Sequence, residues 1–393
     1  MIFGAGINQL ELIKEAKNLG VTSIVIDPSA NPLGKELADF YYQIDGFDYR
    51  KTKEIALKHQ VDGIVTGQME KPLRLMAKLA QELKLIFHSP EVIENSLNKG
   101  LMKRVFIKSD IKCAKGKVYK SSDTITRESL SEFQFPLIIK PSDAFSSRGV
   151  LKVNSFKEIY LYERETRSYS TTDSIIVEEF LEGKEFSLES ITFKGKTHVI
   201  QVTEKFITPY PQAVEMAHLQ PARLSETERS EIKNIVKKAI QSLNIDNSAS
   251  HAEVMMTSNG PYMIEIGARL GGDFISSYLT KASTGISMDK AAIKVALGLR
   301  PSFKKKYNRY SMIKYIDLKK GNKVEKLLPL TDLYKSKGVV FIYYFIKEGE
   351  TIKQITNSAN RTACVLVQSD NIVDLFNLVD KMVFLIKSKI LIS

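Results

Sequence analysis

Two glutamates, Glu253 and Glu265, have a spacing in this sequence that suggests chemistry. They lie in two short apolar segments, Ala252–Met256 and Tyr262–Ile266, on either side of Ser258-Asn259-Gly260. A three-residue hairpin loop that ends on a left-handed glycine would set the two carboxylates directly opposite each other, whereas a two-residue Asn-Gly loop would separate them. Like charges in opposed positions destabilise a sheet, so the first register requires a cation between them. The alternative is an ordinary edge hairpin with solvated glutamates.

Rigid strands that present two carboxylates form the kind of hard-oxygen site that Mg²⁺ takes when it bridges substrate phosphates. Arg269 follows four residues after Glu265, and Gly271 and Gly272 then allow the backbone to turn closely. An arginine fork matches a carboxylate or a phosphate bidentately, which a lysine does not. We therefore expect Arg269 to bind a carboxylate or a phosphate group of a substrate. A structural ion pair with Asp273 is the alternative.

A lysine also stands near the end of the buried apolar segment Pro136–Pro141, just ahead of the small-residue loop Ser142–Gly149. Such a loop can offer backbone N–H groups to oxygen atoms while the Lys140 ammonium meets the negative charge. This arrangement suits a polyphosphate.

The elements that must position these residues begin with alternating strand and helix patterns in residues 1–95, which predict a βαβ arrangement with a parallel sheet. The predicted strands are Met1–Phe3, Thr22–Ile26 and Gly63–Val65, and the predicted helices are Gln9–Leu19, Glu54–His59 and Leu73–Leu85. The turn Gly4–Gln9, followed by Asp27, approaches a dinucleotide fingerprint, but Gln9 stands where the third glycine belongs. A nicotinamide or flavin enzyme is therefore a weaker alternative.

The rest of the chain mixes helices and strands, so the fold class is α/β combined with α+β. The predicted helices are Lys99–Lys108, Ser225–Leu243 and Met288–Leu299, and the predicted strands are Pro136–Pro141, Val150–Val153, Ile175–Phe180 and Glu185–Thr192. Ser225 and Glu228 have the spacing of a capping box. Residues 301–393 predict a separate α+β unit, with strands near Met312–Ile316, Val339–Tyr344 and Thr362–Gln368 and a helix over Asn371–Ser388.

The 393 residues carry a net charge of +12, and residues 301–393 hold 17 Lys and Arg against 8 Asp and Glu. These basic residues are spread among apolar ones without a common nucleic-acid motif, so we expect no nucleic-acid partner. No apolar run is long enough for a membrane span, and no signal-peptide pattern opens the sequence. Cys113 and Cys364 have neither disulfide-framework nor metal-ligand spacing. We therefore expect a cytoplasmic protein without a membrane partner.

Four features occur in a compatible order along the chain: Lys99, the Ile138–Lys140 strand with its loop, the segment Val177–Glu189, and Glu253 with Glu265 and Arg269. In this combination the sequence resembles the ATP-grasp superfamily over roughly residues 1–300. The stretches SSRGV, TEKF, VEMAHLQPA and EIGARLGG are most similar to the L-amino acid ligases, which form dipeptides.

The resemblance implies a nucleotide site and a substrate site. Phosphates would be gripped by Lys99 and Lys140 with the loop residues Ser146, Ser147 and Gly149. Adenosine would be bound by Glu178 at the adenine amino group, by Glu179, Phe180 and Leu181 along the ring edge, and by Glu185 at the ribose hydroxyls. Metal ions would be held by Glu253 and Glu265. Catalysis would use Arg269 and Lys140, and the incoming amine would be held by Glu215 and His218.

The implied fold has a Rossmann-like domain at residues 1–95, an ATP-grasp domain at 96–300 with a lid at about 113–176, and an α+β domain at 301–393. The implied function is an ADP-forming carboxylate–amine ligase that works through an acyl phosphate. It would use ATP and Mg²⁺, with Mn²⁺ as an alternative metal, on small-molecule substrates, and a homodimer is left open. A bicarbonate- or purine-pathway ligase of the same superfamily is the first alternative.

A catalytically weakened ATP-binding protein is the second alternative, because the sequence departs from the family pattern twice. The phosphate loop keeps only Gly149 where the family is usually glycine-rich, and Gly267 stands where a third metal ligand, often an asparagine, is found. Water can fill that third coordination position on Mg²⁺.

Overall fold

The computed structural model describes residues 1–45, 47–145, 148–210 and 213–393. A parallel four-stranded sheet forms the N-terminal part, in the order β3-β2-β1-β4. Its strands are β1 (Ile2–Phe3), β2 (Ile24–Asp27), β3 (Phe40–Gln43) and β4 (Val65–Thr66). Helices α1 (Leu10–Asn18), α2 (Tyr49–Lys58), α3 (Leu73–Leu83) and α4 (Pro90–Leu97) accompany it. The predicted βαβ arrangement is confirmed, while β3 and α4 are additions to it.

The turn after β1 is held by Asp27, whose carboxylate accepts hydrogen bonds from the backbone N–H groups of Ala5 and Ser29, both at 2.8 Å. Gly4 has a φ of +92°, and a Cβ there would lie 2.6 Å from the sulfur of Met69. Asp27 therefore closes its own turn, which removes the acidic group that a dinucleotide ribose would need.

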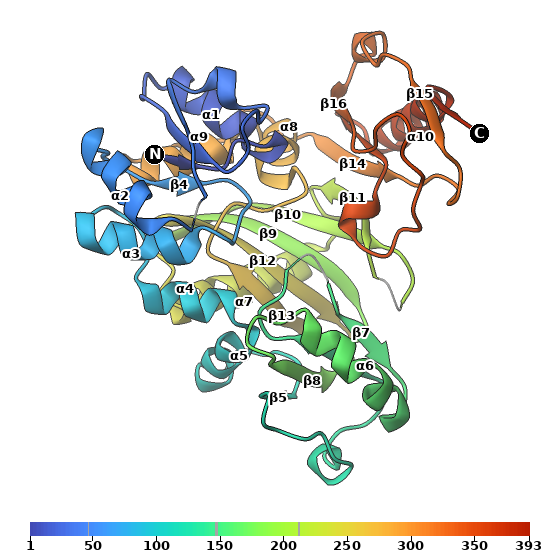
Figure 1. Ribbon diagram of the computed structural model, residues 1–393. Helices are drawn as coiled ribbons and strands as arrows, with labels where there is room; N and C mark the ends of the chain where they lie inside the picture. Colours follow the sequence, from blue (N-terminus) through green and yellow to red (C-terminus); the bar gives the residue numbers. More distant parts are fainter. Residues whose placement is uncertain (46, 146–147, 211–212) are drawn as a thin grey trace.

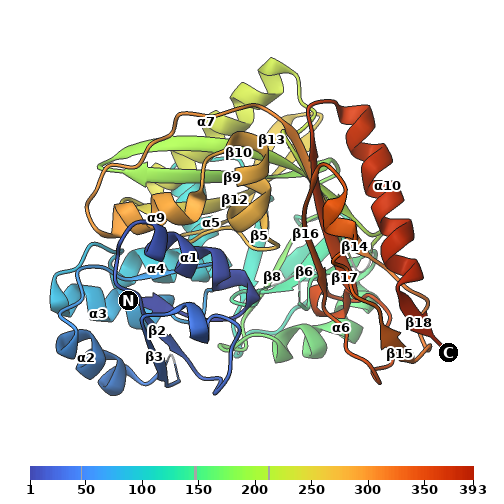
Figure 2. The ribbon, with the colours of Figure 1, turned by 90° about the horizontal axis from the view of Figure 1, so that it is seen from above.

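An antiparallel eight-stranded sheet is the centre of the molecule, in the order β13-β12-β9-β10-β11-β14-β17-β16. Its strands are β9 (Lys184–Phe193), β10 (Lys196–Ile207), β11 (Glu215–Gln220), β12 (Ser248–Thr257), β13 (Gly260–Gly267), β14 (Tyr310–Ile316), β16 (Val339–Tyr344) and β17 (Ala363–Ser369). Alternate residues of β9 face opposite cores: Phe186 and Leu188 pack with α7 (Glu226–Ser242), and Ile191 packs with α9 (Met288–Ala296). Figure 2 shows these two helices on opposite sides of the sheet.

The predicted helices of this region are confirmed. Helix α5 spans Lys99–Lys108, and α7 begins after Ser225, whose hydroxyl accepts from the Glu228 N–H while the Glu228 carboxylate accepts from the Ser225 N–H. This reciprocal pair is the predicted capping box. After β13 the chain forms the π-helical turn Ile275–Leu279, which leads into α8 (Thr280–Thr284).

The hairpin between β12 and β13 pairs Glu253 with Glu265, as one of the two predicted registers requires. The loop, however, is not the one expected, because Thr257 pairs with Gly260 and leaves only two residues between them. A β-bulge at Ile264 then shifts the register by one residue and brings the two glutamates opposite each other. The pairing is confirmed, and the predicted three-residue loop is wrong.

A smaller four-stranded sheet stands apart from the central one, at the lower side of Figure 1. It contains β5 (Gly116–Tyr119), β8 (Ile175–Glu179), β6 (Leu137–Pro141) and β7 (Leu151–Val153), in that order, with α6 (Phe156–Ser168) packed on it. This sheet corresponds to the region expected to form a lid.

The strands of the C-terminal part do not make a sheet of their own, since β14, β17 and β16 extend the central sheet through the pairing of β14 with β11. Helix α10 (Ile372–Ser388) covers them, and β15 (Val324–Leu327) pairs with β18 (Ile390–Ile392). Within the described residues, no helix combines the length and the apolar character that crossing a bilayer requires.

Candidate active site

A cavity of about 310 Å³ lies where the N-terminal part, the lid sheet, the central sheet and the C-terminal part meet. It is lined by every predicted site residue that the structure describes except Gly149, whose neighbours Arg148 and Val150 do line it. Gly149 has a φ of +70°, and a Cβ there would lie 2.6 Å from the Tyr169 ring. A glycine at this position therefore allows the backbone conformation of the loop. The predicted loop residues Ser146 and Ser147 lie outside the described residues.

On the lid side of the cavity, one buried carboxylate lies between two lysines. Glu178 pairs with the Lys140 ammonium and, at 2.9 Å, with the Lys103 ammonium. Burial raises the pKa of the Glu178 carboxyl, but the two ammonium groups outweigh burial and hold that pKa below its usual value. The cluster carries a net positive charge. Lys103 was not among the predicted residues, although its place four residues after Lys99 puts it on the same side of α5.

Lys99 reaches from the first turn of α5 toward the central sheet. Its ammonium lies 3.0 Å from the Glu265 carboxylate and donates to the carbonyl oxygen of Ala144 at 2.8 Å. The predicted phosphate-gripping lysine thus lies between the loop and one of the predicted metal ligands.

Next to these charges the cavity has an apolar slot. The Phe180 ring meets the Tyr210 ring edge to face at 5.1 Å, and the Lys152 ammonium lies 3.8 Å from the Phe180 ring centre. The slot is lined by Phe180, Leu181, Ile138, Met255, Ile264 and Ala114. Apolar walls with a few polar groups at the edge, here Glu178 and Glu179, suit a flat heteroaromatic ring.

On the central-sheet side, one buried lysine lies among three carboxylates. Lys205 of β10 is 2% exposed, and its ammonium pairs with Glu185, with Glu215 at 2.6 Å and with Glu253 at 2.9 Å. Burial lowers the pKa of Lys205, but the three carboxylates raise it well above the usual value. Burial, with the neighbouring Glu253 and Glu215, raises the pKa of Glu185 to about 7 in spite of Lys205. The cluster is therefore short of positive charge.

Glu253 and Glu265 both offer hard oxygen atoms, although the described group of carboxylates close enough to hold one ion contains Glu253 and not Glu265. Each carboxylate is in contact with an ammonium group, Lys205 for Glu253 and Lys99 for Glu265, so cations already compensate both. Carboxylate oxygens of Glu185, Glu215 and Glu253 also lie within 4.8 Å of one another. Hard oxygen donors in this number suit Mg²⁺.

A second layer of buried groups supports Glu253. The His251 Nε2 atom lies 3.5 Å from Glu253, and its Nδ1 atom lies 2.5 Å from the fully buried Glu189. Although burial lowers the pKa of His251, Glu189 and Glu253 raise it to about 10, so the ring is an imidazolium at neutral pH. Glu189 also accepts from the Ser276 hydroxyl at 2.8 Å. A Cβ at Gly271 would lie 2.5 Å from the Glu189 carboxylate, which explains the glycine there.

Arg269 lines the cavity and pairs with Glu70 of the N-terminal part, to which its Nε atom donates at 2.7 Å. The alternative pairing with Asp273 is wrong, because Asp273 is held by the Arg361 guanidinium through two hydrogen bonds of 2.6 and 2.7 Å. Glu70 and Arg361 were both missed by sequence reasoning. Neither lies within a recognisable motif, and each meets its partner only through the tertiary fold.

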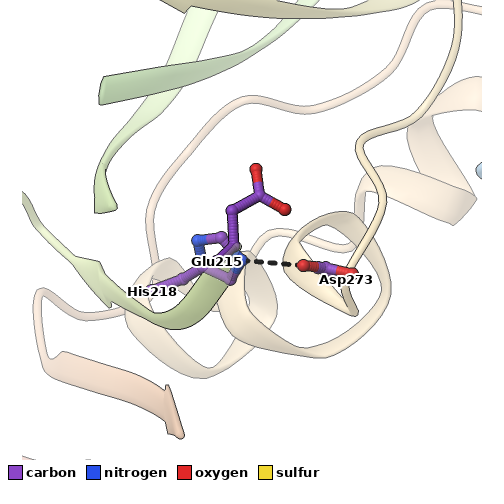
Figure 3. A group of neighbouring side chains, drawn as sticks. All are labelled: Glu215, His218 and Asp273. Atoms are coloured by element: carbon purple, nitrogen blue, oxygen red, sulfur yellow. Dashed lines mark hydrogen bonds and ion pairs between the residues drawn. The ribbon is translucent and has the colours of Figure 1, made fainter. Parts of the chain in front are cut away.

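Glu215, His218 and Asp273 lie together at the far end of the cavity (Figure 3). The His218 Nε2 atom lies 3.1 Å from the Asp273 carboxylate, and a Glu215 carboxylate oxygen lies within 4.8 Å of both residues. The Nδ1 atom of His218 is buried and has no hydrogen-bond partner within the described residues. Asp273 thus orients the ring through Nε2 and leaves Nδ1 without a partner among the described residues.

Comparison with known proteins agrees with this geometry. Residues 133–277 match the family described as ATP-grasp domain. Alanine–anticapsin ligase of Bacillus subtilis strain 168 is 28% identical over 273 residues, which cover 61% of this chain and 57% of that protein. D-alanine–D-alanine ligase of Flavobacterium johnsoniae is 29% identical over 153 residues, covering 37% of this chain and 46% of that protein. The matched segments thus span less than two thirds of these relatives.

Two solved structures extend the similarity to the whole chain. The L-amino acid ligase from Bacillus licheniformis has a TM-score of 0.82 and 22% identity, and covers 100% of this chain and 97% of that one. Phosphoribosylglycinamide synthetase from Anaerococcus prevotii has a TM-score of 0.79 and 25% identity, with 100% and 98% coverage. The fold of this chain is the ATP-grasp fold.

Proposed function

We propose that this chain, an ATP-grasp protein, is an ADP-forming ligase that joins a carboxylate to an amine. The observation that carries the proposal is that two oppositely charged clusters border one cavity. Lys140 and Glu178 line it on one side, with Lys103 paired behind them, and Glu185, Glu215 and Glu253 line it on the other, with Lys205 paired behind them. A nucleotide phosphate chain that carries divalent cations is complementary to both.

In the proposed reaction, a substrate carboxylate oxygen attacks the γ-phosphorus of ATP. The bond from that phosphorus to the β,γ-bridging oxygen breaks, which gives ADP and an acyl phosphate. The amine nitrogen then attacks the acyl carbon, the carbon–oxygen bond to phosphate breaks, and the nitrogen loses a proton. No protein nucleophile is required, so the enzyme works through positioning and charge neutralisation.

Each end of the nucleotide has a proposed place. The adenine ring enters the slot beside Phe180 and Leu181, and the phosphates meet Lys140 and Lys99. Mg²⁺, held by Glu253 and Glu265, would neutralise charge on the transferring phosphoryl group. The lid sheet closes over the phosphates and keeps water away from the acyl phosphate.

The Arg269–Glu70 pair supports an amino acid as the carboxylate substrate. A guanidinium and a carboxylate that face one cavity are the complement of a zwitterion, whose carboxylate would pair with Arg269 and whose ammonium would pair with Glu70. The amine substrate would lie near Glu215 and His218, with the unpaired Nδ1 of His218 as the proton acceptor. Similarity to alanine–anticapsin ligase and to an L-amino acid ligase points the same way.

The departure at Gly267 does not require lost activity, because water can fill the third coordination position on Mg²⁺. A Cβ at this position would make only an ordinary contact of 3.4 Å with the Arg269 side chain, so the local space does not explain the glycine. We propose Mg²⁺ as the metal, with Mn²⁺ as a substitute, small-molecule substrates, and the cytoplasm as the compartment. The two cysteines of the chain, Cys113 and Cys364, are unpaired, which suits a reducing environment.

The test is a screen of the full chain with Mg²⁺, ATP and pairs of amino acids, in which ADP, AMP, phosphate and the coupled product are measured together. We expect ADP, phosphate and a dipeptide in equal amounts with at least one pair. Stoichiometric AMP and pyrophosphate would contradict the acyl-phosphate reaction. ADP formation that needs bicarbonate and no amino acid would favour the bicarbonate-type alternative.

A further inference from the structure

A second cavity of about 310 Å³ lies between α7, β10 and the connection from α9 to β14. Figure 2 shows that connection passing alongside α7. The cavity is lined by Val199, Ile200, Gln201, Pro221, Glu226, Arg229, Lys233, Lys305 and Asn308. None of these residues lines the cavity of the proposed active site.

Three cations, Arg229, Lys233 and Lys305, face this cavity with little to compensate them. Arg229 pairs with Glu226 at 3.7 Å, but that glutamate side chain is 95% exposed and therefore contributes little. Within the described ranges, neither lysine takes part in an ion pair. Burial and the Arg229 guanidinium lower the pKa of Lys233, while burial, Lys233 and Arg229 lower the pKa of Lys305. The three groups repel one another.

Positive charge also gathers around His198, which precedes the lining residue Val199 in β10. Burial lowers the pKa of His198, and Lys196, Arg300 and Lys237 lower it further. The His198 ring is stacked on Phe303 of the α9–β14 connection at 4.0 Å, which fixes that connection beside β10. A recess with fixed walls and several like charges has an electrostatic cost that a bound anion would remove.

We propose that this recess is an anion-binding site for a small phosphate-bearing molecule. Arg229 would bind a phosphate oxygen through its Nη1 atom, because its Nη2 atom already donates to the carbonyl oxygens of Ala222 and Leu224, and Lys233 and Lys305 would bind as point charges. The Asn308 and Gln201 amides can donate further hydrogen bonds, and Pro221 with Val199 offers an apolar wall for the rest of the molecule. A multiply charged oxyanion is favoured over a single carboxylate because three cations converge there. This inference does not depend on the proposed reaction.

The test is differential lysine labelling of the full chain with an amine-reactive ester, read by mass spectrometry. MgADP is present in every arm to fill the main cavity, and NaCl keeps the ionic strength equal. We expect pyrophosphate to slow the labelling of Lys233 and Lys305 several-fold and to leave Lys381, an exposed lysine of α10, unchanged. Equal protection of all three lysines, or protection of none, would overturn the proposal.

Two further arms identify the source of the phosphate. Protection by inorganic phosphate at similar concentrations assigns the site to the free anion, and protection by a phosphate monoester alone assigns it to a larger metabolite. A third arm uses a double-stranded oligonucleotide. If the oligonucleotide protects Lys196, Lys237 and Lys305 and pyrophosphate protects none of them, the proposal is wrong and these lysines belong to an extended nucleic-acid-binding surface.

Variants provide an independent check. Arg229→Gln combined with Lys233→Gln should abolish pyrophosphate protection of Lys305, whereas the matched surface change Lys381→Gln should not. Both proteins should keep the probe-free turnover of the parent, because none of these residues lines the main cavity. Undiminished protection of Lys305 in the double variant would show that the recess does not bind the probe.

Discussion

The two charged clusters of the main cavity are near mirror images in charge. In one, Glu178 lies between the ammonium groups of Lys140 and Lys103; in the other, Lys205 lies among the carboxylates of Glu185, Glu215 and Glu253. The first cluster has one positive charge in excess, and the second has up to two negative charges in excess. Both central groups are almost fully buried, so the excess charge is poorly screened by water.

This difference teaches how the cavity selects its ligand. An anion alone would satisfy the lysine-rich cluster and be repelled by the acidic one, and a divalent cation alone would show the reverse preference. A nucleotide phosphate that carries Mg²⁺ satisfies both at once. Burial and the neighbouring Glu253 and Glu215 raise the pKa of Glu185 to about 7, and Lys205 alone does not offset this rise.

Removing a carboxylate from the acidic side of the cavity should have the largest effect on turnover. Glu265→Gln keeps the size of the side chain but removes a charge that we propose binds the metal, and we expect Mg²⁺-dependent turnover to fall by about 100-fold or more. The fold should survive, because the Lys99 ammonium retains its hydrogen bond to the Ala144 carbonyl. Steady-state kinetics across a Mg²⁺ titration measure the change.

Glu226→Gln is the matched control for this variant, since Glu226 is almost fully exposed and lies outside the main cavity. Its turnover should equal that of the parent. Near-normal turnover of Glu265→Gln at an unchanged Mg²⁺ dependence would contradict the proposed metal site.

Arg269 tests the region between the clusters. Arg269→Lys keeps the charge next to Glu70 but loses the planar fork, so ATP affinity should stay within about two-fold while kcat falls about ten-fold or more. Nucleotide titration and steady-state kinetics separate these two effects. A kcat like that of the parent would mean that the pair with Glu70 is purely structural.

Breaking the lysine-rich side should weaken nucleotide binding rather than abolish it. Lys140→Ala removes one charge-assisted phosphate contact, which corresponds to about 1.5–3 kcal/mol of ATP binding. Lys103 and Lys99 remain, so binding should still be measurable by calorimetry. Lys117→Ala, at an exposed position of β5, is the control and should bind ATP like the parent. Unchanged affinity in Lys140→Ala would remove this lysine from the phosphate site.

The local elements of these clusters could be read from the sequence, whereas their partners could not. Periodicity and capping residues locate α5, β6, α7 and β12, and therefore Lys99, Lys140 and Glu253, because these signals depend on neighbours within a few residues. Glu185, Glu215 and Glu253 come from β9, β11 and β12, and the order of those strands is a property of the sheet. Lys205 lies in the stretch TEKF (203–206), which contributed to the family resemblance but suggested no role for the lysine.

Pairings across long sequence separations were equally out of reach. The C-terminal strands were located correctly, but the sequence could not show that β14 joins β11, because every strand pattern allows either a new sheet or an extension. The bulge at Ile264 shows the same limit at short range: the opposed glutamates were predicted, but the loop chosen to explain them was wrong. The ion pairs of Glu70 with Arg269 and of Arg361 with Asp273 are further pairings that the sequence could not show.

Asp289 sharpens the comparison, because it is a buried carboxylate that lacks a direct cation. It lies in the first turn of α9, is 1% exposed, and neither of its oxygen atoms has a hydrogen-bond partner within the described residues. Burial, with Glu11 and Glu15 nearby, raises its pKa to about 7, and Lys281 offsets this only in part. Asp289 thus has the raised pKa of a buried carboxyl group, whereas the ammonium groups of Lys140 and Lys103 prevent such a rise at Glu178.

The smallest effect is therefore expected from Asp289→Asn, and on stability rather than turnover. An aspartate titrates near pH 4 when unfolded, so its raised folded pKa leaves stability intact below about pH 4 and removes stability as the pH rises to about 7. Asn cannot ionise, so the variant should gain on the order of 1–3 kcal/mol relative to the parent between pH 5 and pH 8. Urea unfolding at both pH values measures the gain, with Asp374→Asn in the exposed first turn of α10 as the control. A gain that is the same at pH 5 and pH 8 would show that the carboxylate is compensated in the folded protein.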